Sequence, residues 1–445
     1  MTVTTMTFKK KHVLLVPYPA FGHVTPLLEL GKKLVESHHV TFLVSDCKIA
    51  SIRRKEIMLH QDDSDSSVKL LGLMDGLTDE DDKNLTPARF MSNLKRAGTV
   101  MRQIYRTMPV GSKDNQKCDY QSQLFTGTME WPVDTVISDL VMGAYAVACF
   151  DRGVPFHIFN PSPGIILLKL LESVLINSVT EFEPNTTKTI EKHPFVLGKP
   201  VRFVAPLFPE ADTGKNAKQP LSNKVTLSQI RQWLNNRTDN TVTYVSFGSM
   251  AIPSQDQIRE IAKALMTLQR PFIWSLKTAE QEYLPEELLA NMENQFECDL
   301  KYIIVPWVPQ KMVLKHPATR LFISHCGWNS TMEAIVGGVP VVAWPLFGDQ
   351  HWDAELLVKE GMALKIPDTD LFFTRLVTAE EIVQVILKVG GATGRAMMIE
   401  PFRRNAKMAR KMTEIAVRKG GSSYVALQEL IVDIGTYHID SQPSK

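Results

Sequence analysis

The chain has 445 residues, a hydrophobic content of 44% and a formal net charge of +2 at pH 7. This length suits two domains, and the near-neutral charge gives no reason to expect nucleic acid or an anionic membrane as a partner. Its five cysteines form no Cys-x-x-Cys pair, which favours reduced thiols in the cytoplasm and argues against a zinc site.

The sequence shows no targeting or membrane-spanning segment. Residues Met1–Lys11 lack the apolar core of a secretory signal, and the end of the chain is polar. The longest apolar runs, such as Val339–Trp344, are far too short to cross a bilayer. We therefore expect a cytoplasmic protein without a transmembrane segment.

The first half of the chain alternates strand and helix. His12–Pro17 predicts a buried parallel strand, Tyr18–Thr25 a loop and Pro26–Leu34 a helix, before a second strand at Val40–Val44. Such a βαβ unit is typical of a parallel sheet with helices on its faces. A later strand, Thr135–Ile137, leads to Asp139.

The same alternation restarts in the second half, after a polar segment at Pro209–Asn223 that is typical of a linker. Strands are expected at Val242–Ser249, Phe272–Leu276, Tyr302–Val305 and Val339–Trp344, with a helix at Gln255–Leu268. We predict an α/β protein of two Rossmann-like domains that face an interdomain cleft, because ligands of such sheets bind beyond the carboxyl ends of the strands. The expected domains are residues 1–208 and 237–445, joined by a linker region over 209–236, with the last helix packing back on the first domain.

The most informative segment is Ser324-His325-Cys326-Gly327-Trp328-Asn329-Ser330, between a predicted strand at Arg320–Ile323 and a predicted helix at Thr331–Val336. A strand that enters a helix through a short turn leaves backbone N–H groups unpaired at the helix N-terminus. Together with the helix dipole they form an anion site, and phosphate is the expected anion. A P-loop and a dinucleotide fingerprint are excluded, because the Lys-Ser/Thr signature and the Gly-x-Gly-x-x-Gly spacing are absent.

The residues around this segment resemble the secondary product glycosyltransferase box of the plant-type family 1 UDP-dependent glycosyltransferases. The box positions outside the segment are Trp307-Val308-Pro309-Gln310, Glu333 and the run from Pro345 to Asp349-Gln350. The resemblance extends over nearly the whole chain, through Gly22-His23 with Pro26, Ser138-Asp139 with Met142, Asn177 with Glu181 and Glu183, and Gly420–Tyr424. It implies the GT-B fold.

The resemblance implies a catalytic pair in the first half. His23, expected in a loop after the first strand, would take the proton of the acceptor as that oxygen attacks the sugar. Asp139 would fix the tautomer of His23 and stabilise the imidazolium that forms. From position alone, His23 could instead be an exposed loop residue, and Asp139 a cap of the following helix.

The resemblance also implies a site for a UDP-sugar in the second half. Trp307 would stack on uracil, beside Val308, while Gln310 and Glu333 would hold the ribose hydroxyls. The pyrophosphate contacts would be Ser249, His325, Asn329 and Ser330, with Gly327 letting the backbone come close. Trp328, Asp349 and Gln350 would face the sugar, and Gln350 resembles the residue of glucose users. Without the motif, Trp307 and His325 could be core residues and Glu333 a solvated one.

Taken together, the resemblance implies an inverting UDP-glucose-dependent O-glycosyltransferase that moves glucose to a hydroxyl or carboxyl of a small apolar acceptor, such as a phenolic, flavonoid or terpenoid, to give a β-glucoside. UDP-sugar is a co-substrate, no metal or other cofactor is expected, and the protein is expected to be a monomer. The alternatives are another donor (UDP-galactose, UDP-xylose or UDP-rhamnose) and a catalytically inactive nucleotide-sugar-binding protein. An epimerase or a pyridoxal phosphate-dependent phosphorylase is not indicated by any motif.

Three features leave the substrates open. Asp353 stands where the family commonly has Asn, His351 follows Gln350, and the middle of the chain is shorter than usual for the family. The apolar walls of the acceptor site are expected at Phe90-Met91, Leu124-Phe125 and Pro163–Ile166. Two Asp-x-Asp tripeptides, at residues 63–65 and 368–370, lie in charged surroundings and predict solvated turns rather than metal sites.

Overall fold

The computed structural model of the protein divides into two compact units, Met1–Pro209 with Ile415–Lys445 and Glu210–Glu414. It describes residues 10–59, 68–78, 81, 87–111, 117–143, 149, 152–160, 173–183, 200–207, 220–222, 225–248, 253–290, 292, 301–346, 349–369, 375–391 and 400–436. Where the sequence suggested a linker over 209–236, the described residues form β9 (Pro220–Ser222), β10 (Val225–Thr226) and α7 (Leu227–Asn235) of the second unit.

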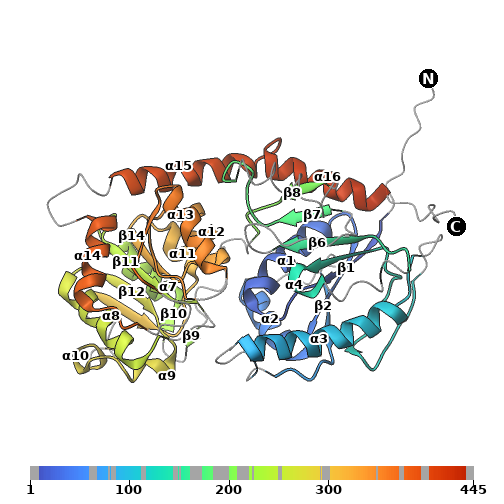
Figure 1. Ribbon diagram of the computed structural model, residues 1–445, viewed down its shortest axis with the longest axis horizontal. Helices are drawn as coiled ribbons and strands as arrows, with labels where there is room; N and C mark the ends of the chain where they lie inside the picture. Colours follow the sequence, from blue (N-terminus) through green and yellow to red (C-terminus); the bar gives the residue numbers. More distant parts are fainter. Residues whose placement is uncertain are drawn as a thin grey trace. The chain divides into compact units, whose positions relative to one another are not determined.

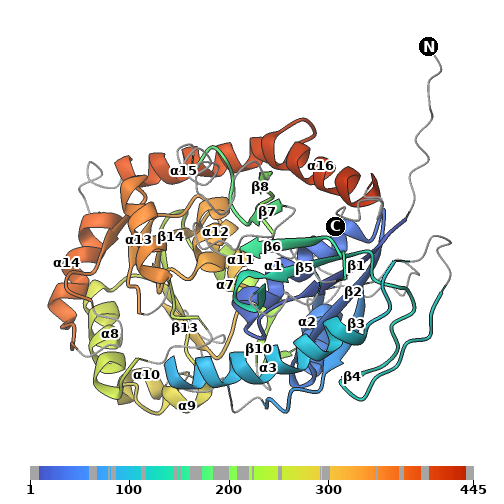
Figure 2. The same ribbon diagram turned by 45° about the vertical axis from the view of Figure 1, so that its right-hand side comes forward.

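The first unit contains an eight-stranded sheet in the order β4-β3-β2-β1-β5-β6-β7-β8. Its neighbouring strands are parallel except for β3 and β4, and Figure 2 shows β2, β1, β5 and β6 side by side. The strands are β1 (His12–Val16), β2 (His39–Ser45), β3 (Lys69–Leu73), β4 (Phe125–Thr126), β5 (Thr135–Asp139), β6 (Phe156–Asn160), β7 (Ser173–Ile176) and β8 (Val201–Phe203).

Helices α1 (Phe21–Leu34), α2 (Asp46–Leu59), α3 (Pro87–Thr107), α4 (Leu140–Gly143) and α16 (Ser422–Thr436) belong to the same unit. The last of these lies against β8 (Figure 1), where Arg202 pairs with Asp433. Leu430 and Ile434 of α16 are buried in the same core as Val13, Leu15 and Phe42. The end of the chain therefore completes the core of the unit in which the chain begins.

Helix α1 begins earlier than the sequence suggested, at Phe21 rather than Pro26. A proline cannot donate a helical hydrogen bond and disfavours a helical residue before it, which is why the pattern placed Pro26 at the start. In the structure Pro26 lies inside the helix, and the backbone N–H groups of His23 and Val24 close the first turn on the carbonyl of Ala20. His23 therefore lies in the first turn of a helix, not in a loop as expected.

The second unit contains a six-stranded sheet whose neighbouring strands are all parallel, in the order β13-β12-β11-β14-β15-β16. The strands are β11 (Val242–Ser246), β12 (Phe272–Ser275), β13 (Tyr302–Val305), β14 (Thr319–Ser324), β15 (Val341–Ala343) and β16 (Ala363–Lys365). The helices include α8 (Gln255–Leu268), α9 (Thr278–Gln281), α10 (Glu286–Leu289), α11 (Gln310–Lys315), α12 (Trp328–Gly337), α13 (Gln350–Lys359) and α14 (Ala379–Gly390), and α15 (Glu400–Ala416) crosses the boundary to the first unit.

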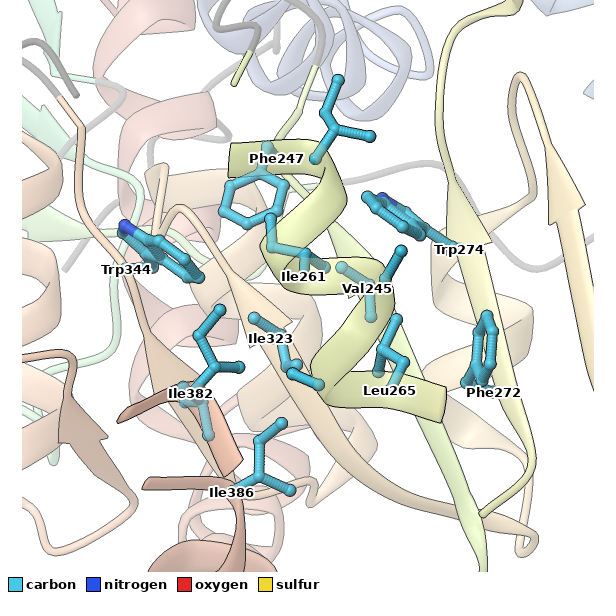
Figure 3. Close-up of a cluster of buried hydrophobic side chains, with 14 of the residues drawn as sticks. Val245, Phe247, Ile261, Leu265, Phe272, Trp274, Ile323, Trp344, Ile382 and Ile386 are labelled. Carbon is cyan, nitrogen blue, oxygen red and sulfur yellow. The ribbon is translucent and has the colours of Figure 1, made fainter. Parts of the chain in front are cut away.

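Helices α8 and α14 cover one hydrophobic core of this sheet. Figure 3 shows Ile261 and Leu265 of α8 facing Val245 of β11 and Ile323 of β14, with Ile382 of α14 beside them. These side chains are buried, and each such burial stabilises the fold by roughly 1.5–3 kcal/mol. The packing holds β11 and β14 as rigid neighbours, so the residues that follow the two strands are held close together.

Each sheet has one point at which the strand order reverses. In the first unit it lies between β1 and β5, and in the second between β11 and β14. The connections that leave two such strands run to opposite sides, and in open α/β sheets ligands bind at the carboxyl ends of the strands beside this point. The two switch points therefore indicate where the functional residues of each unit should lie.

Candidate functional site

His23 and Asp139 meet at the switch point of the first unit. Asp139 is the last residue of β5, and His23 lies in the first turn of α1, shortly after β1. Because β1 and β5 are paired neighbours, the two side chains reach each other, and His23 Nδ1 lies 2.7 Å from Asp139 Oδ2. The structure thus brings together two residues that are far apart in the sequence.

Asp139 is held from two directions. Its side chain is fully buried, and while Oδ2 accepts from His23, Oδ1 accepts from the backbone N–H of Val141 at 2.8 Å. The second bond caps the short helix α4, so the two interpretations of Asp139, helix cap and histidine partner, both hold. With both oxygens engaged, the carboxylate keeps a fixed orientation toward His23.

The His23 ring has the geometry of a general base. A carboxylate can only accept, so Nδ1 carries the proton of the hydrogen bond, and the neutral ring then has its lone pair on Nε2. The side chain is 26% exposed, and its ring meets the Tyr18 ring edge-on at 5.4 Å. The ring is therefore oriented on two sides and still accessible to a small molecule.

His325 occupies the corresponding place in the second unit. It directly follows β14, and Gly248 follows β11, the neighbouring strand across the switch point. A Cβ atom at Gly248 or at Gly327 would lie 2.6 Å from His325 Nε2, and Gly248 has a positive φ of 76°. The imidazole thus lies between two backbones that only glycine allows so close. Ser249, another of the expected pyrophosphate contacts, lies outside the described residues.

Burial sets the charge of His325. It lowers the pKa of the imidazole to about 4, although the charge of Asp349 and the carbonyl of Ser246 act in the opposite direction. At neutral pH the ring is therefore uncharged. It can offer an N–H group to a phosphate oxygen but no positive charge.

Helix α12 starts at Trp328, three residues before the predicted start at Thr331, and ends at Gly337, where Gly338 caps it in the left-handed conformation. The first intrahelical bond joins Thr331 N to Gly327 O at 3.0 Å. The backbone N–H groups of Trp328, Asn329 and Ser330 precede that bond and point along the axis of the helix dipole. They lie where the sequence predicted an anion site, and Trp328 itself is only 4% exposed.

Gln310 joins two other expected ligand residues. Its Nε2 donates to Glu333 Oε2 at 2.7 Å and to Ser330 Oγ at 2.9 Å. Burial raises the pKa of Glu333 to about 7, against the hydrogen bond of Gln310 and the charge of Lys311. Glu333 is thus a partly buried carboxyl group held in place, not a solvated helix residue.

Trp307 is 47% exposed, unlike the fully buried Trp274 and Trp344. It follows β13 and offers a flat aromatic surface, so the interpretation as a core tryptophan is wrong. Val308 beside it is only 1% exposed. A ligand on this segment would meet the Trp307 ring, whereas Val308 is enclosed.

Asp349 and Gln350 form the start of α13. Asp349 is the residue at the N-cap position, and Gln350 is only 4% exposed, with its Oε1 accepting from the backbone N–H of Leu346 at 2.9 Å. This bond orients the amide of Gln350. His351 lies 3.4 Å from Lys365 Nζ on β16, and Asp353 is fully buried.

The sequence reasoning missed two residues of this region. Tyr244, in the middle of β11, donates to Gln310 Oε1 at 3.2 Å, and Gly248 makes room for His325. The signals were present as a phenol within an apolar strand and a glycine two residues after the strand ends, but only the tertiary contacts give them a role.

Other expected features lie partly outside the described residues. This applies to Pro163–Ile166, to the side chains of Phe90 and Met91 and to the tripeptide at 63–65, whereas Phe125 is buried on β4. Within the described ranges, no group of three or more His, Cys, Asp or Glu side chains could hold a metal ion. No helix of that same part of the chain has the length and apolar character to cross a membrane.

Comparisons with known proteins identify the family of the chain. A family model described as "UDP-glucoronosyl and UDP-glucosyl transferase" matches residues 178–386. UDP-glycosyltransferase 84A4 of Arabidopsis thaliana is 30% identical over 96% of this chain and 97% of its own length. Crocetin glucosyltransferase, chloroplastic, of Gardenia jasminoides is 27% identical over 96% of this chain and 98% of its own length.

The fold likeness covers both units. The crystal structure of UGT71G1 from Medicago truncatula, complexed with UDP-glucose, matches 96% of this chain and 98% of that one with a TM-score of 0.72 at 22% sequence identity. This likeness confirms the expected α/β fold of the GT-B type. The chain belongs to the plant family 1 UDP-glycosyltransferases and is an enzyme of that family.

Proposed function

We propose that the protein transfers glucose from UDP-glucose to an oxygen of a small apolar acceptor, with inversion at the anomeric carbon and without a metal ion. The observation that carries the proposal is the His23–Asp139 pair, with 2.7 Å between Nδ1 and Oδ2. A base oriented by a buried carboxylate is what an acceptor hydroxyl needs in order to become a nucleophile.

In the proposed step, the acceptor O–H gives its proton to His23 Nε2 while its oxygen forms a bond to the anomeric carbon. The bond from that carbon to the diphosphate oxygen breaks at the same time, and UDP leaves with the electron pair. Attack from the face opposite UDP turns an α-linked donor into a β-glucoside. Asp139 stabilises the imidazolium that results, because its buried carboxylate already accepts the Nδ1 proton.

The second unit would hold the donor. Uracil would stack on the exposed ring of Trp307, and Glu333 and Gln310 would take the ribose hydroxyls. The N–H groups of Asn329 and Ser330, with neutral His325, would meet the diphosphate. These donors would offset the charge that develops on UDP as it leaves, a role that a divalent metal has in other transferases.

The choice of glucose is supported by Asp349 and Gln350 at the start of α13. Asp349 offers acceptor oxygens and Gln350 a donor amide, a pair that can tell one arrangement of sugar hydroxyls from another. The names of the Gardenia relative and of the Medicago complex point to the same donor. The name of the Gardenia relative, a crocetin glucosyltransferase, supports a small apolar acceptor.

The test is a panel of UDP-glucose, UDP-galactose, UDP-xylose and UDP-rhamnose against phenolic, flavonoid and terpenoid acceptors, read by mass spectrometry in excess EDTA. We expect a glucoside mass with UDP-glucose, and a β-linkage by NMR. A requirement for Mn²⁺ would contradict the metal-free mechanism, and preferred transfer from another donor would contradict the choice of glucose. Binding of UDP-glucose without transfer to any acceptor would indicate an inactive nucleotide-sugar-binding protein.

A further inference from the structure

A chain of hydrogen bonds leads from the interior of the second sheet to Glu333. The hydroxyl of Tyr244, in the middle of β11, lies 3.2 Å from Ser275 Oγ at the end of β12 and 3.2 Å from Gln310 Oε1. Gln310 Nε2 in turn donates to Glu333 Oε2 at 2.7 Å and to Ser330 Oγ at 2.9 Å. Four elements, β11, β12, α11 and α12, thus contribute to one polar network.

Tyr244 decides which way the Gln310 amide faces. The phenol donates to Oε1, so the NH₂ group of the same amide is directed to Glu333 and Ser330. In the reversed amide, Oε1 would face the Glu333 carboxylate, and two acceptors would repel each other. A donor behind Gln310 therefore stabilises the one orientation in which Gln310 supports an ionised Glu333.

The phenol is a permanent donor. Tyr244 is 1% exposed, and its ring stacks on Phe322 of the neighbouring strand β14 at 4.9 Å between ring centres. Burial raises the pKa of Tyr244 far above its usual range, so the hydroxyl keeps its proton at every physiological pH. The charge of Glu333 acts in the same direction as burial, so the phenol stays a donor while Glu333 is ionised.

Glu333 is the group on which this network acts. With Oε2 engaged by Gln310, Oε1 remains to accept from a ligand hydroxyl. The groups that act on the carboxyl are Gln310 and Lys311 of α11, and its charge in turn acts on Tyr244 of β11. Gln310 and Lys311 favour the ionised form against burial, so the loss of either one would disfavour it.

We propose that Tyr244, supported by Ser275, is a positioning residue for the donor: it holds the Gln310 amide so that Glu333 stays an acceptor for the ribose hydroxyls of the UDP-sugar. This inference rests on the proposed binding of UDP-glucose to the second unit. Tyr244 itself would touch no substrate atom. Its effect would be on donor affinity and on the pH at which the donor binds.

The test is Tyr244→Phe, which removes only the hydroxyl and keeps the stacked ring. UDP-glucose affinity is measured by titration calorimetry between pH 6 and 9, because this sugar diphosphate has no terminal phosphate that titrates near neutrality. We expect Kd and the donor KM to rise about threefold to tenfold at pH 7, with kcat changed less than about twofold. The acid limb of the affinity profile, where Kd rises as the pH falls, should move to higher pH, because Glu333 loses support for its ionised form. The difference in Kd between the variant and the wild type should shrink at pH 9.

Tyr302→Phe is the matched control. Tyr302 lies on β13 in the same sheet, stacks on Phe272 and donates its hydroxyl to backbone carbonyls of α10, away from Gln310. We expect this variant to leave Kd and the pH limb as in the wild type. If Tyr244→Phe changes the melting temperature but neither Kd nor the pH limb, Tyr244 is only a core residue and the inference is wrong.

A double variant distinguishes an effect of Tyr244 on Glu333 from a general loss of rigidity in the second unit. Glu333→Gln cannot ionise, so adding Tyr244→Phe to it should not shift the pH dependence any further. An equal pH shift in both backgrounds would contradict the inference. Should Tyr244→Phe not fold, Ser275→Ala serves instead, with a smaller change in the same direction expected and no change contradicting the inference. A wild-type protein that binds no UDP-glucose at all would contradict the proposed function itself.

Discussion

At the scale of single residues, the central feature is a buried carboxylate with two fixed partners. Asp139 accepts from His23 Nδ1 through one oxygen and from the backbone of Val141 through the other. The second bond prevents the carboxylate from rotating away, so the His23 tautomer is determined by the end of β5 rather than by solvent. The helix cap and the proposed partner of the catalytic base are thus one side chain.

The first prediction concerns Asp139→Asn. The Asn oxygen can still cap α4, but its NH₂ group would face His23 Nδ1 and favour the tautomer that carries its proton on Nε2. We expect kcat to fall by at least about 100-fold, while the Kd for UDP-glucose stays within about twofold of the wild type, because the general base acts on transfer alone. Turnover within a factor of about three of the wild type would show that the tautomer is not set by Asp139.

At the scale of elements, the turns after two neighbouring strands enclose His325, a residue proposed to bind phosphate. The turn after β11 and the turn after β14 close on the imidazole of His325 through Gly248 and Gly327. Gly248 has a positive φ, whereas Gly327 has a φ of −57° that any residue can adopt. Gly327 therefore tests the packing on His325 without backbone strain.

The second prediction concerns Gly327→Ala. Its Cβ would lie 2.6 Å from His325 Nε2, so the ring or the start of α12 must move. We expect the donor KM to rise about tenfold, the order expected when a phosphate contact worth about 1.5 kcal/mol is lost. The control is Gly390→Ala, whose Cβ would make only ordinary contacts of 3.5 Å or more. Equal donor KM values for the two variants would contradict the assignment of His325 to the phosphate site.

At the scale of the whole molecule, each unit contains a buried neutral histidine. Burial lowers the pKa of His12 to about 4 in the first unit and that of His325 to about 4 in the second. Since an unfolded histidine has a pKa near 6.5, the unfolded chain binds more protons between pH 6.5 and 4. Stability is therefore lost as the pH falls through that window. Glu333, whose pKa is raised, contributes the opposite dependence: its share of the stability is lost as the pH rises from 4.5 toward 7.

The third prediction follows from His12, whose ring bonds to the carbonyl of Trp131 and to Thr41. His12→Gln should be less stable than the wild type at pH 7.5, because these bonds are weakened. Its melting temperature should fall less steeply between pH 6.5 and 4.5, because the unfolded variant has no His12 to protonate. In the wild type this protonation destabilises the fold by about 1.4 kcal/mol per pH unit. Parallel pH profiles for the two proteins would show that His12 does not titrate on unfolding.

Periodicity and motif spacing predicted much of this molecule. The helix at Gln255–Leu268 and the strands at Tyr302–Val305 and Phe272–Ser275 follow the expected ranges to within one residue, because their apolar residues recur with the period of one element. The start of α1 was misplaced, because Pro26 is tolerated inside a helix whose buried side packs on the sheet. The pKa of Glu333, the enclosure of His325 and the bond from Tyr244 depend on contacts between distant segments, which no local pattern reports.

The central claim is that His23 is the base of a UDP-glucose-dependent transfer. The most direct measurement compares His23→Ala with the wild type on UDP-glucose and an acceptor alcohol that is not ionised at the assay pH, with kcat from product formation and donor Kd from calorimetry. We predict that kcat falls about 100-fold or more while the Kd for UDP-glucose is unchanged, because the base moves the proton of the acceptor and does not hold the donor. A kcat close to that of the wild type, or a loss of donor binding equal to the loss of turnover, would contradict the account.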